Sequence, residues 1–188
     1  MFDIVARWHG EHANFSRLLD VLERQLAAFQ DDERPDFELM GSIVAYLREF
    51  PDRYHHPRED VAFERMLARD PDLRLPINRL LQEHRAIAAA GDDLLSRLSD
   101  AVAGMMVSRA AVESAVALYT AYFRHHIGTE ERVILPRAAR LLTAEDWSLI
   151  EQSVPAAPDP LFGDAPDERY RSLREHLSAS AGRSDRPA

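Results

Sequence analysis

Apolar residues recur at spacings of three and four along most of the chain, and this spacing predicts helices. In the segment from Asp3 to Phe29, one face carries Ile4, Val5, Trp8, Phe15, Leu19, Leu22 and Leu26. His12 lies on the same face, and the polar stretch DDERPD closes the helix. The strict alternation typical of half-buried strands is nearly absent. The pattern therefore predicts an all-α protein.

Helix-capping residues support three more long helices. Asp36 can cap the second helix, Ser108 can cap the fourth, and Gly104 ends the third. The predicted helices cover residues 36–69, 76–103 and 108–142.

Prolines interrupt two of these helices. Pro51 and Pro57 lie inside the second helix, and Pro136 lies inside the fourth. Each proline removes a backbone donor and clashes with the preceding turn, so a kink or local break is expected at each place.

The remaining chain has weaker helical signals. Thr143 and Asp146 resemble a capping box, which predicts a short helix ending near Gln152. The segment after Pro155 is irregular in composition, a short helix is predicted over residues 170–177, and the last residues, SASAGRSDRPA, are expected to be disordered.

Long helices with short connections favour an all-α fold, an antiparallel up-down-up-down four-helix bundle with a short C-terminal helical extension. The bundle should span residues 1–153, and residues 154–188 should form the extension, part of it disordered.

Charge and composition restrict the partners. The formal net charge of −9 and the acidic pI near 5.3 disfavour nucleic acid and anionic lipid as partners. The chain has no cysteine, which excludes disulfide bonds, thiolate metal ligands and a cysteine nucleophile. The start, MFDIVARWHGEH, lacks the apolar run of a signal peptide, so a cytoplasmic location is expected.

A pattern of histidines and glutamates occurs twice. Each copy has the dipeptide EH on one helix and H-x-x-x-E on the next. The first copy is Glu11–His12 with His55 and Glu59, and the second is Glu83–His84 with His126 and Glu130. Every second-copy residue follows its counterpart by 71 or 72 positions. This regularity indicates an internal repeat.

Helical spacing directs the repeated side chains inward. His12 and His84 share faces with apolar residues, and each H-x-x-x-E pair lies one turn apart on one face. Burying four imidazoles and two carboxylates costs several kcal/mol per ion without compensation. Metal ions are the simplest compensation, and nitrogen and oxygen ligands without sulfur suit Fe, Mn, Zn or Co. Two ions that share both carboxylates would keep open positions for a small ligand such as dioxygen, nitric oxide or peroxide.

Several neighbouring residues have weaker roles. His56 and His125 lie about 100° around the helix from the repeated histidines, so they are expected beside the ligands or at the surface. His9, one turn before His12, is expected next to a ligand, and Asp60 and Glu131 can hydrogen-bond nearby. The apolar stripe of Tyr119, Tyr122 and Phe123 is typical of a core, although one tyrosine could donate to a bound oxygen species.

Together the motifs EH, YHHPRED, EH and HHIGTEERVILP resemble the hemerythrin-like HHE cation-binding proteins, over roughly Phe2 to Leu142. The resemblance implies a non-haem diiron site, oxo- or hydroxo-bridged, in a four-helix bundle; Mn or Zn are possible substitutes. Carried over by position, the ligands would be His12, His55, Glu59, His84, His126 and Glu130.

The pattern departs from that of oxygen carriers, whose irons are held by five histidines. This chain matches the H-HxxxE-H-HxxxE subgroup, in which four histidines are evident, and a fifth could come from His9, His56 or His125.

The leading functional hypothesis is a diiron protein that binds, senses or reacts with O₂, NO or peroxide. A diiron redox enzyme for peroxide disproportionation or NO-linked redox, iron storage or donation in a stress response, and a purely structural bundle are the alternatives. The expected partner is a small diatomic or peroxide ligand, with no nucleic acid and no membrane, and the sequence leaves the oligomeric state open.

Overall fold

The computed structural model describes residues 4–31, 33–154 and 157–184. Within these ranges the protein is all-helical and contains no strand, as predicted. The α-helices are α1 Ile4–Gln30, α2 Phe37–Phe50, α3 His56–Arg69, α4 Arg74–Val102, α5 Arg109–Thr129, α6 Leu135–Leu141, α7 Ala144–Ser153 and α8 Arg171–Ser184. Short helical turns link some of them: η1 Pro51–His55, η2 Pro71–Leu73, η3 Glu130–Ile134 and η4 Glu168–Tyr170.

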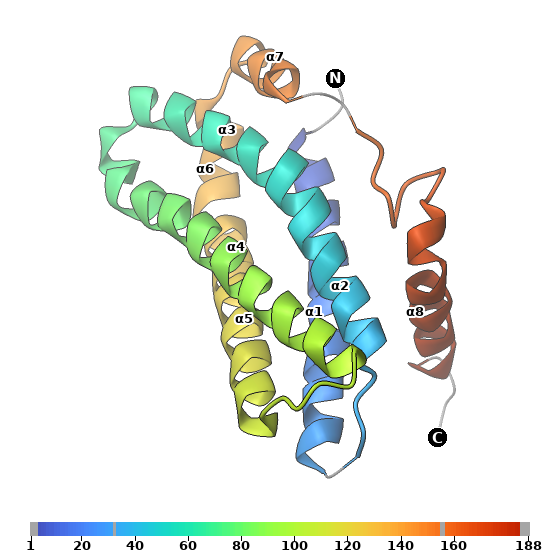
Figure 1. The fold of residues 1–188 in the computed structure, drawn as a ribbon. Coiled ribbons are helices and arrows are strands. Elements are labelled where there is room, and N and C mark those ends of the chain that lie inside the picture. The colour runs from blue at the N-terminus through green and yellow to red at the C-terminus, as the bar shows by residue number, and fades with distance from the viewer. Residues whose placement is uncertain (1–3, 32, 155–156, 185–188) are drawn as a thin grey trace.

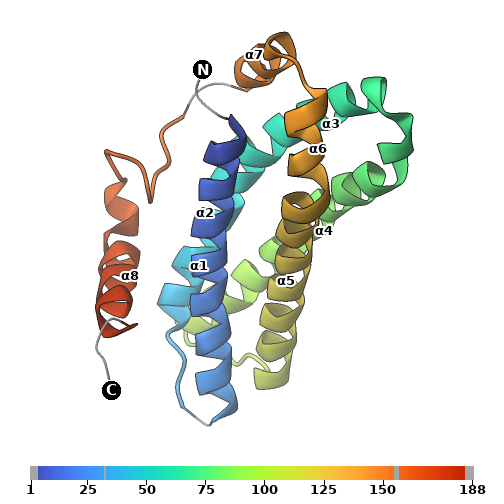
Figure 2. The same cartoon turned by 180° about the vertical axis from the view of Figure 1, so that it is seen from behind.

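Successive long segments run in alternating directions and lie side by side (Figures 1 and 2). Helices α1 and α4 each pack against both α2 and α5, so the four surround a common interior. Helix α7 lies across the end of α3 (Figure 1). None of the helices in the described ranges combines the length and apolar character needed to cross a lipid bilayer.

Two separate apolar clusters fill the interior. One contains Phe15, Leu47 and Leu94, and the other contains Trp8, Phe63 and Leu80. Along each long segment, the repeated histidines and glutamates fall between residues of the first cluster and residues of the second. The buried polar residues thus form a layer that is closed off by apolar side chains on both sides.

The predicted breaks at the prolines are π-helical turns. In η1 the amide of His56 donates to the carbonyl of Pro51, and in η3 the amide of Leu135 donates to that of Glu130, so these bonds span five residues instead of four. Pro57 and Pro136 each lie two positions after the end of such a turn. Because proline clashes with the carbonyl of the preceding turn, it favours a widened turn there.

Most predicted helix ends are confirmed. The Asp36 side chain accepts from the Leu39 amide at 2.9 Å, and Thr143 and Asp146 form a capping box at α7. Gly104 ends α4 with a φ of 74°, a left-handed conformation that glycine adopts without strain. Ser108 occupies the N-cap of α5, but its side chain makes no capping bond.

The C-terminal segment packs on α2. Tyr46 donates to Asp159 at 2.9 Å and Tyr170 donates to Glu49 at 2.8 Å. Helix α8 continues to Ser184, so it is longer than the expected helix ending at Leu177, and the disorder expected at the end of the chain stays a prediction. Residues 155–156 and 185–188 lie outside the described part, and the division of the chain at residue 153 stays a prediction.

Candidate metal centre

The four repeated histidines form two facing pairs. His12 of α1 and His55 of η1 bring their Nε2 atoms to 2.9 Å. His84 of α4 and His126 of α5 bring theirs to 3.1 Å. All four side chains are buried. Each pair joins two different segments, and each pair aims its nitrogens at one point in the interior.

Glu59 and Glu130 lie between the two pairs. Oε1 of Glu59 lies 3.1 Å from His55 Nε2, and its Oε2 lies 3.7 Å from His84 Nε2. Oε2 of Glu130 lies 3.4 Å from His12 Nε2 and 3.3 Å from His126 Nε2. Both carboxylates therefore reach both histidine pairs, as bridging ligands would.

The environment of these carboxylates fits a cation. Glu59 and Glu130 are fully buried, and all four of their oxygens lack a hydrogen-bond partner. A buried carboxylate without such partners is costly. The described residues form two groups whose ligand atoms are close enough to hold an ion: His12, His55, Glu59 and Glu130, and His56, Glu59, His84 and His126.

The nitrogen separations favour a particular geometry. Two ligands at right angles around an ion about 2.1 Å away lie roughly 3.0 Å apart, whereas tetrahedral ligands lie about 3.4 Å apart. The observed separations of 2.9 and 3.1 Å match the right-angled arrangement. Histidine nitrogens and carboxylate oxygens at these spacings can hold a divalent cation.

Each repeated histidine has a carboxylate on its other ring nitrogen. The Nδ1 distances are 2.7 Å from His12 to Glu131, 2.6 Å from His55 to Glu11, 2.8 Å from His84 to Asp60 and 3.3 Å from His126 to Glu83. Such carboxylates hold an imidazole in the tautomer that leaves Nε2 free for a metal. Hydrogen bonds to Asp60 and Glu131 were expected. The role of Glu11 and Glu83 was missed, although the repeated EH dipeptide was its signal.

The outer carboxylates follow the internal repeat. Glu11 and Glu83 each hydrogen-bond to a histidine of their own copy of the repeat. Asp60 and Glu131 each hydrogen-bond to a histidine of the other copy. The two halves thus depend on each other for the orientation of their ligands. This exchange gives the centre an approximate two-fold symmetry.

His56 breaks that symmetry. Of the two places expected for it, beside the ligands or at the surface, the structure shows the first, since it is buried and its ring stacks on His84 at 4.3 Å. The π-helical turn ending at His55 shifts the helix phase, so both adjacent histidines face inward. Its Nδ1 lies 3.0 Å from Asp52. Burial, together with His84 and His126, holds the pKa of His56 well below its usual range, so the ring is neutral, as a ligand must be.

Other predicted neighbours lie outside the ligand positions. The His125 side chain is 55% exposed and approaches Glu83 at 3.2 Å. His9 contacts Glu131 at 2.6 Å, beside His12. Tyr119 is fully buried in the apolar core, whereas Tyr122 is exposed, so the expected tyrosine stripe is only partly internal.

Without a metal, His12 and His84 retain protons. Burial lowers the pKa of His12, but hydrogen bonding to Glu131 and the proximity of Glu59 outweigh burial and raise this pKa to about 10. For His84, burial is likewise outweighed by Asp60 and Glu59, and the pKa rises to about 10. A metal ion that binds these rings must displace a proton from each.

The pKa values of the two central glutamates, Glu59 and Glu130, are shifted in opposite directions. Burial acts to raise the pKa of Glu59, but the imidazoles, His55 foremost, hold it well below its usual range. Burial and the negative charge of Glu59 raise the pKa of Glu130. The pKa values of the two carboxyls of the metal-free site are therefore shifted in opposite directions, as happens when two carboxyls share one site.

A helical protein whose interior holds converging histidines and shared carboxylates is built to bind cations. The family model of the hemerythrin HHE cation-binding domain matches residues 3–138, and the chain belongs to this family. A search of curated proteins and a search of solved structures each found no match.

Proposed function

We propose that the chain is a hemerythrin-type up-down-up-down four-helix bundle that holds two iron ions. The proposed ligands are His12 and His55 for one ion and His84 and His126 for the other, with both bridged by the carboxylates Glu59 and Glu130. His56 offers the second ion a further nitrogen. When bound, an iron pair supplies reversible one-electron redox chemistry and positions at which a small molecule can coordinate.

The observation that carries this proposal is the set of four buried, unpartnered carboxylate oxygens between two converging Nε2 pairs. A packed structural core would leave those oxygens hydrogen-bonded or replace them with apolar groups. The raised pKa values of His12 and His84 support the proposal, because they indicate that cations, either protons or metal ions, stabilise this arrangement.

For function, we infer binding, sensing or reaction with O₂, NO or peroxide. Neutral imidazoles outnumber the carboxylates in the proposed ligand set, which favours the ferrous state more than a carboxylate-rich oxidation site would. Asp60, Glu11, Glu83 and Glu131 orient the imidazoles, and the apolar clusters on both sides of the polar layer exclude water.

A redox enzyme at the same site is the second candidate. Peroxide disproportionation requires proton transfer, and the outer carboxylates connect the site with solvent. The Asp60 side chain is 48% exposed while it contacts His84. This contact offers a short proton path from the surface to a ligand ring.

Anaerobic titration with ferrous iron tests the proposal. It should saturate at two ions per chain, and oxidation should then produce the absorption of an oxo-bridged diferric centre. Saturation at one ion per chain would refute the dinuclear site. Steady-state turnover of peroxide by the loaded protein would favour the enzyme, whereas a stable adduct without turnover would favour the binder or sensor.

A further inference from the structure

A depression of about 180 Å³ between α3 and α4 reaches two buried histidines of the centre. Its lining consists of Asp52, His56, Pro57, Asp60, His84, Arg85 and Ala88. His56 and His84 form its inner end, since both are buried, and Arg85 is exposed at its rim. The depression therefore brings solvent as far as the rings of His56 and His84.

The repeat-related side of the centre is packed differently. The counterparts of Asp52 and His56, 71 positions later, are Phe123 and Ile127, and both are buried apolar residues. The counterpart of Pro57 is Gly128, where a Cβ atom would lie only 2.8 Å from the Arg132 guanidinium. Apolar side chains and an arginine thus cover this side.

Solvent exposure agrees with this asymmetry. His84 retains 8% of its exposure, whereas its repeat counterpart His12 retains 2%. The two histidines have equivalent partners, an Nε2 neighbour and a carboxylate on Nδ1. The difference therefore comes from the surrounding side chains and not from the ligand arrangement itself.

We propose that this α3–α4 depression is the route by which small ligands reach the centre. This inference rests on the proposed function and concerns access to the same site. The volume lies below the roughly 300–1,000 Å³ of sites for drug-sized ligands, so larger molecules are excluded.

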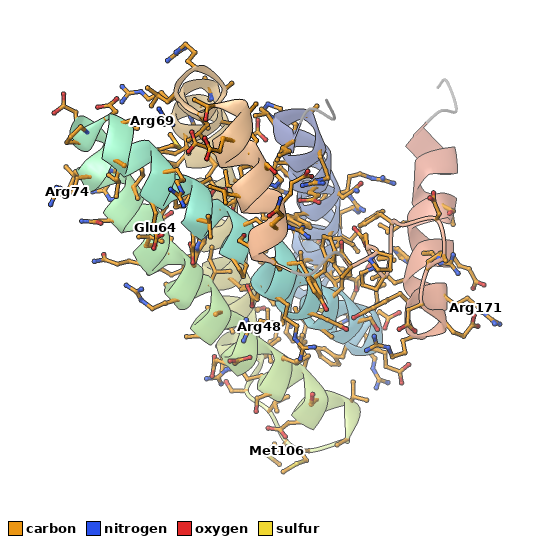
Figure 3. The ribbon with its side chains drawn as sticks, turned by 90° about the horizontal axis from the view of Figure 1, so that it is seen from above. Arg48, Glu64, Arg69, Arg74, Met106 and Arg171 are labelled. Carbon is orange, nitrogen blue, oxygen red and sulfur yellow. The ribbon has the colours of Figure 1, made fainter. Side chains whose placement is uncertain are left out.

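The charges at the rim are nearly balanced. Asp52 and Asp60 contribute two carboxylates and Arg85 one cation, so the formal charge of the lining is negative when both histidines are neutral. Arg48, labelled in Figure 3, contacts Asp52 and also donates to Asp92 at 2.8 Å, which ties α2 to α4. The Arg48 guanidinium offsets the Asp52 carboxylate, so the rim has no net charge that would concentrate ions in competition with dioxygen, nitric oxide or hydrogen peroxide.

The repeat supplies a matched pair of variants. Ala88 lines the depression one turn after His84, and Ser16 occupies the equivalent place one turn after His12. Ala88→Phe should fill the depression, and Ser16→Phe should add the same ring on the covered side. Neither residue is a proposed ligand.

The kinetic probe is nitric oxide mixed anaerobically with the diferrous protein in a stopped-flow instrument. Ala88→Phe should slow adduct formation at least about tenfold, a barrier increase of about 1.4 kcal/mol, while iron content and the final adduct spectrum stay unchanged. Ser16→Phe should match the wild type. Equal rates in all three proteins, or equal slowing by both variants, would overturn the proposal.

A second readout needs no metal. Deuterium exchange at the imidazole C2 position of the metal-free protein, followed by mass spectrometry, reports how water reaches each histidine. Ala88→Phe should slow exchange at His84 and leave His12 unchanged; an unchanged His84 rate would count against the route. Should Ala88→Phe fail to fold, Ala88→Leu serves in both experiments.

The two proposals fail in different ways. A wild-type protein that binds no iron, or forms no adduct, refutes the proposed function, and the exchange experiment still decides the route. A wild type that forms the adduct at a rate unaffected by Ala88→Phe refutes the route alone.

Discussion

Replacing Glu11 with glutamine should weaken metal binding more than replacing its repeat counterpart Glu83. The Glu11 carboxylate lies 2.6 Å from Nδ1 of His55, a short charge-assisted hydrogen bond. Glu83 lies 3.3 Å from Nδ1 of His126 and also contacts His125. Glutamine keeps the length of the side chain and an acceptor oxygen but removes the charge.

The magnitude can be worked out from these distances. Loss of a carboxylate that orients a metal-bound histidine typically costs 10–100-fold in affinity, or about 1.4–2.7 kcal/mol. The short bond of Glu11 places Glu11→Gln near the upper end of that range. Because the Glu83 contact is near the length limit of a hydrogen bond, Glu83→Gln belongs near the lower end.

Competition with a chelator of known affinity measures the effect, with Mn²⁺ or anaerobic Fe²⁺ as the probe. Glu64→Gln is the control, because Glu64 is exposed on α3 (Figure 3). An affinity for Glu11→Gln equal to that of the control would show that this carboxylate does not orient a ligand. A larger loss for Glu83→Gln than for Glu11→Gln would refute the link between hydrogen-bond length and affinity.

The site supports three further predictions. His56→Ala should weaken binding of the second metal ion whereas His125→Ala should leave both ions bound, as measured by iron content and absorption; equal iron content in both variants would remove His56 from the centre. Stripping the metal with a chelator should lower the melting temperature, because Glu59 and Glu130 then remain buried without cation partners apart from protonated imidazoles; identical melting of both forms would contradict a buried metal site. Metal affinity should rise with pH between about 6.5 and 10, because the pKa values of His12 and His84 are raised to about 10 and each bound proton must leave. The same raised pKa values stabilise the metal-free fold. This stabilisation is complete below about pH 6.5, and the melting temperature of the metal-free protein should fall as the pH rises toward 10. A pH-independent affinity would show that these rings bind metal without losing protons.

The sequence by itself determined the helices and the composition of the site. A spacing of three and four is a local property of a helix, so it placed the long helices and the inward faces of His12 and His84. The internal repeat then identified six of the seven residues that the structure brings together in two groups, and His56 is the seventh. The helices and their inward faces could be predicted because helical spacing depends only on neighbours within one or two turns. The repeat could be predicted because it is visible as equal offsets in the sequence itself.

Tertiary structure alone decided how the two adjacent-histidine pairs differ. In sequence, His55–His56 and His125–His126 look like copies, yet aligning the repeats pairs His55 with His126 and His56 with Ile127. A widened turn ends at His55, whereas in the second half it begins after the histidines, at Glu130. The extra residue in the turn rotates the next part of the helix about its axis, and a periodicity of 3.6 cannot reveal this rotation.

The outer carboxylates and the open side of the centre also required the packed fold. Asp60 and Glu131 hold histidines that are 24 and 119 residues away in sequence. The depression beside His84 is lined by Asp52 and Ala88 from two segments, whereas the repeat counterpart of Asp52 is the buried Phe123. Such arrangements depend on which faces meet across the interior, and helical spacing within one segment carries no information about its partner.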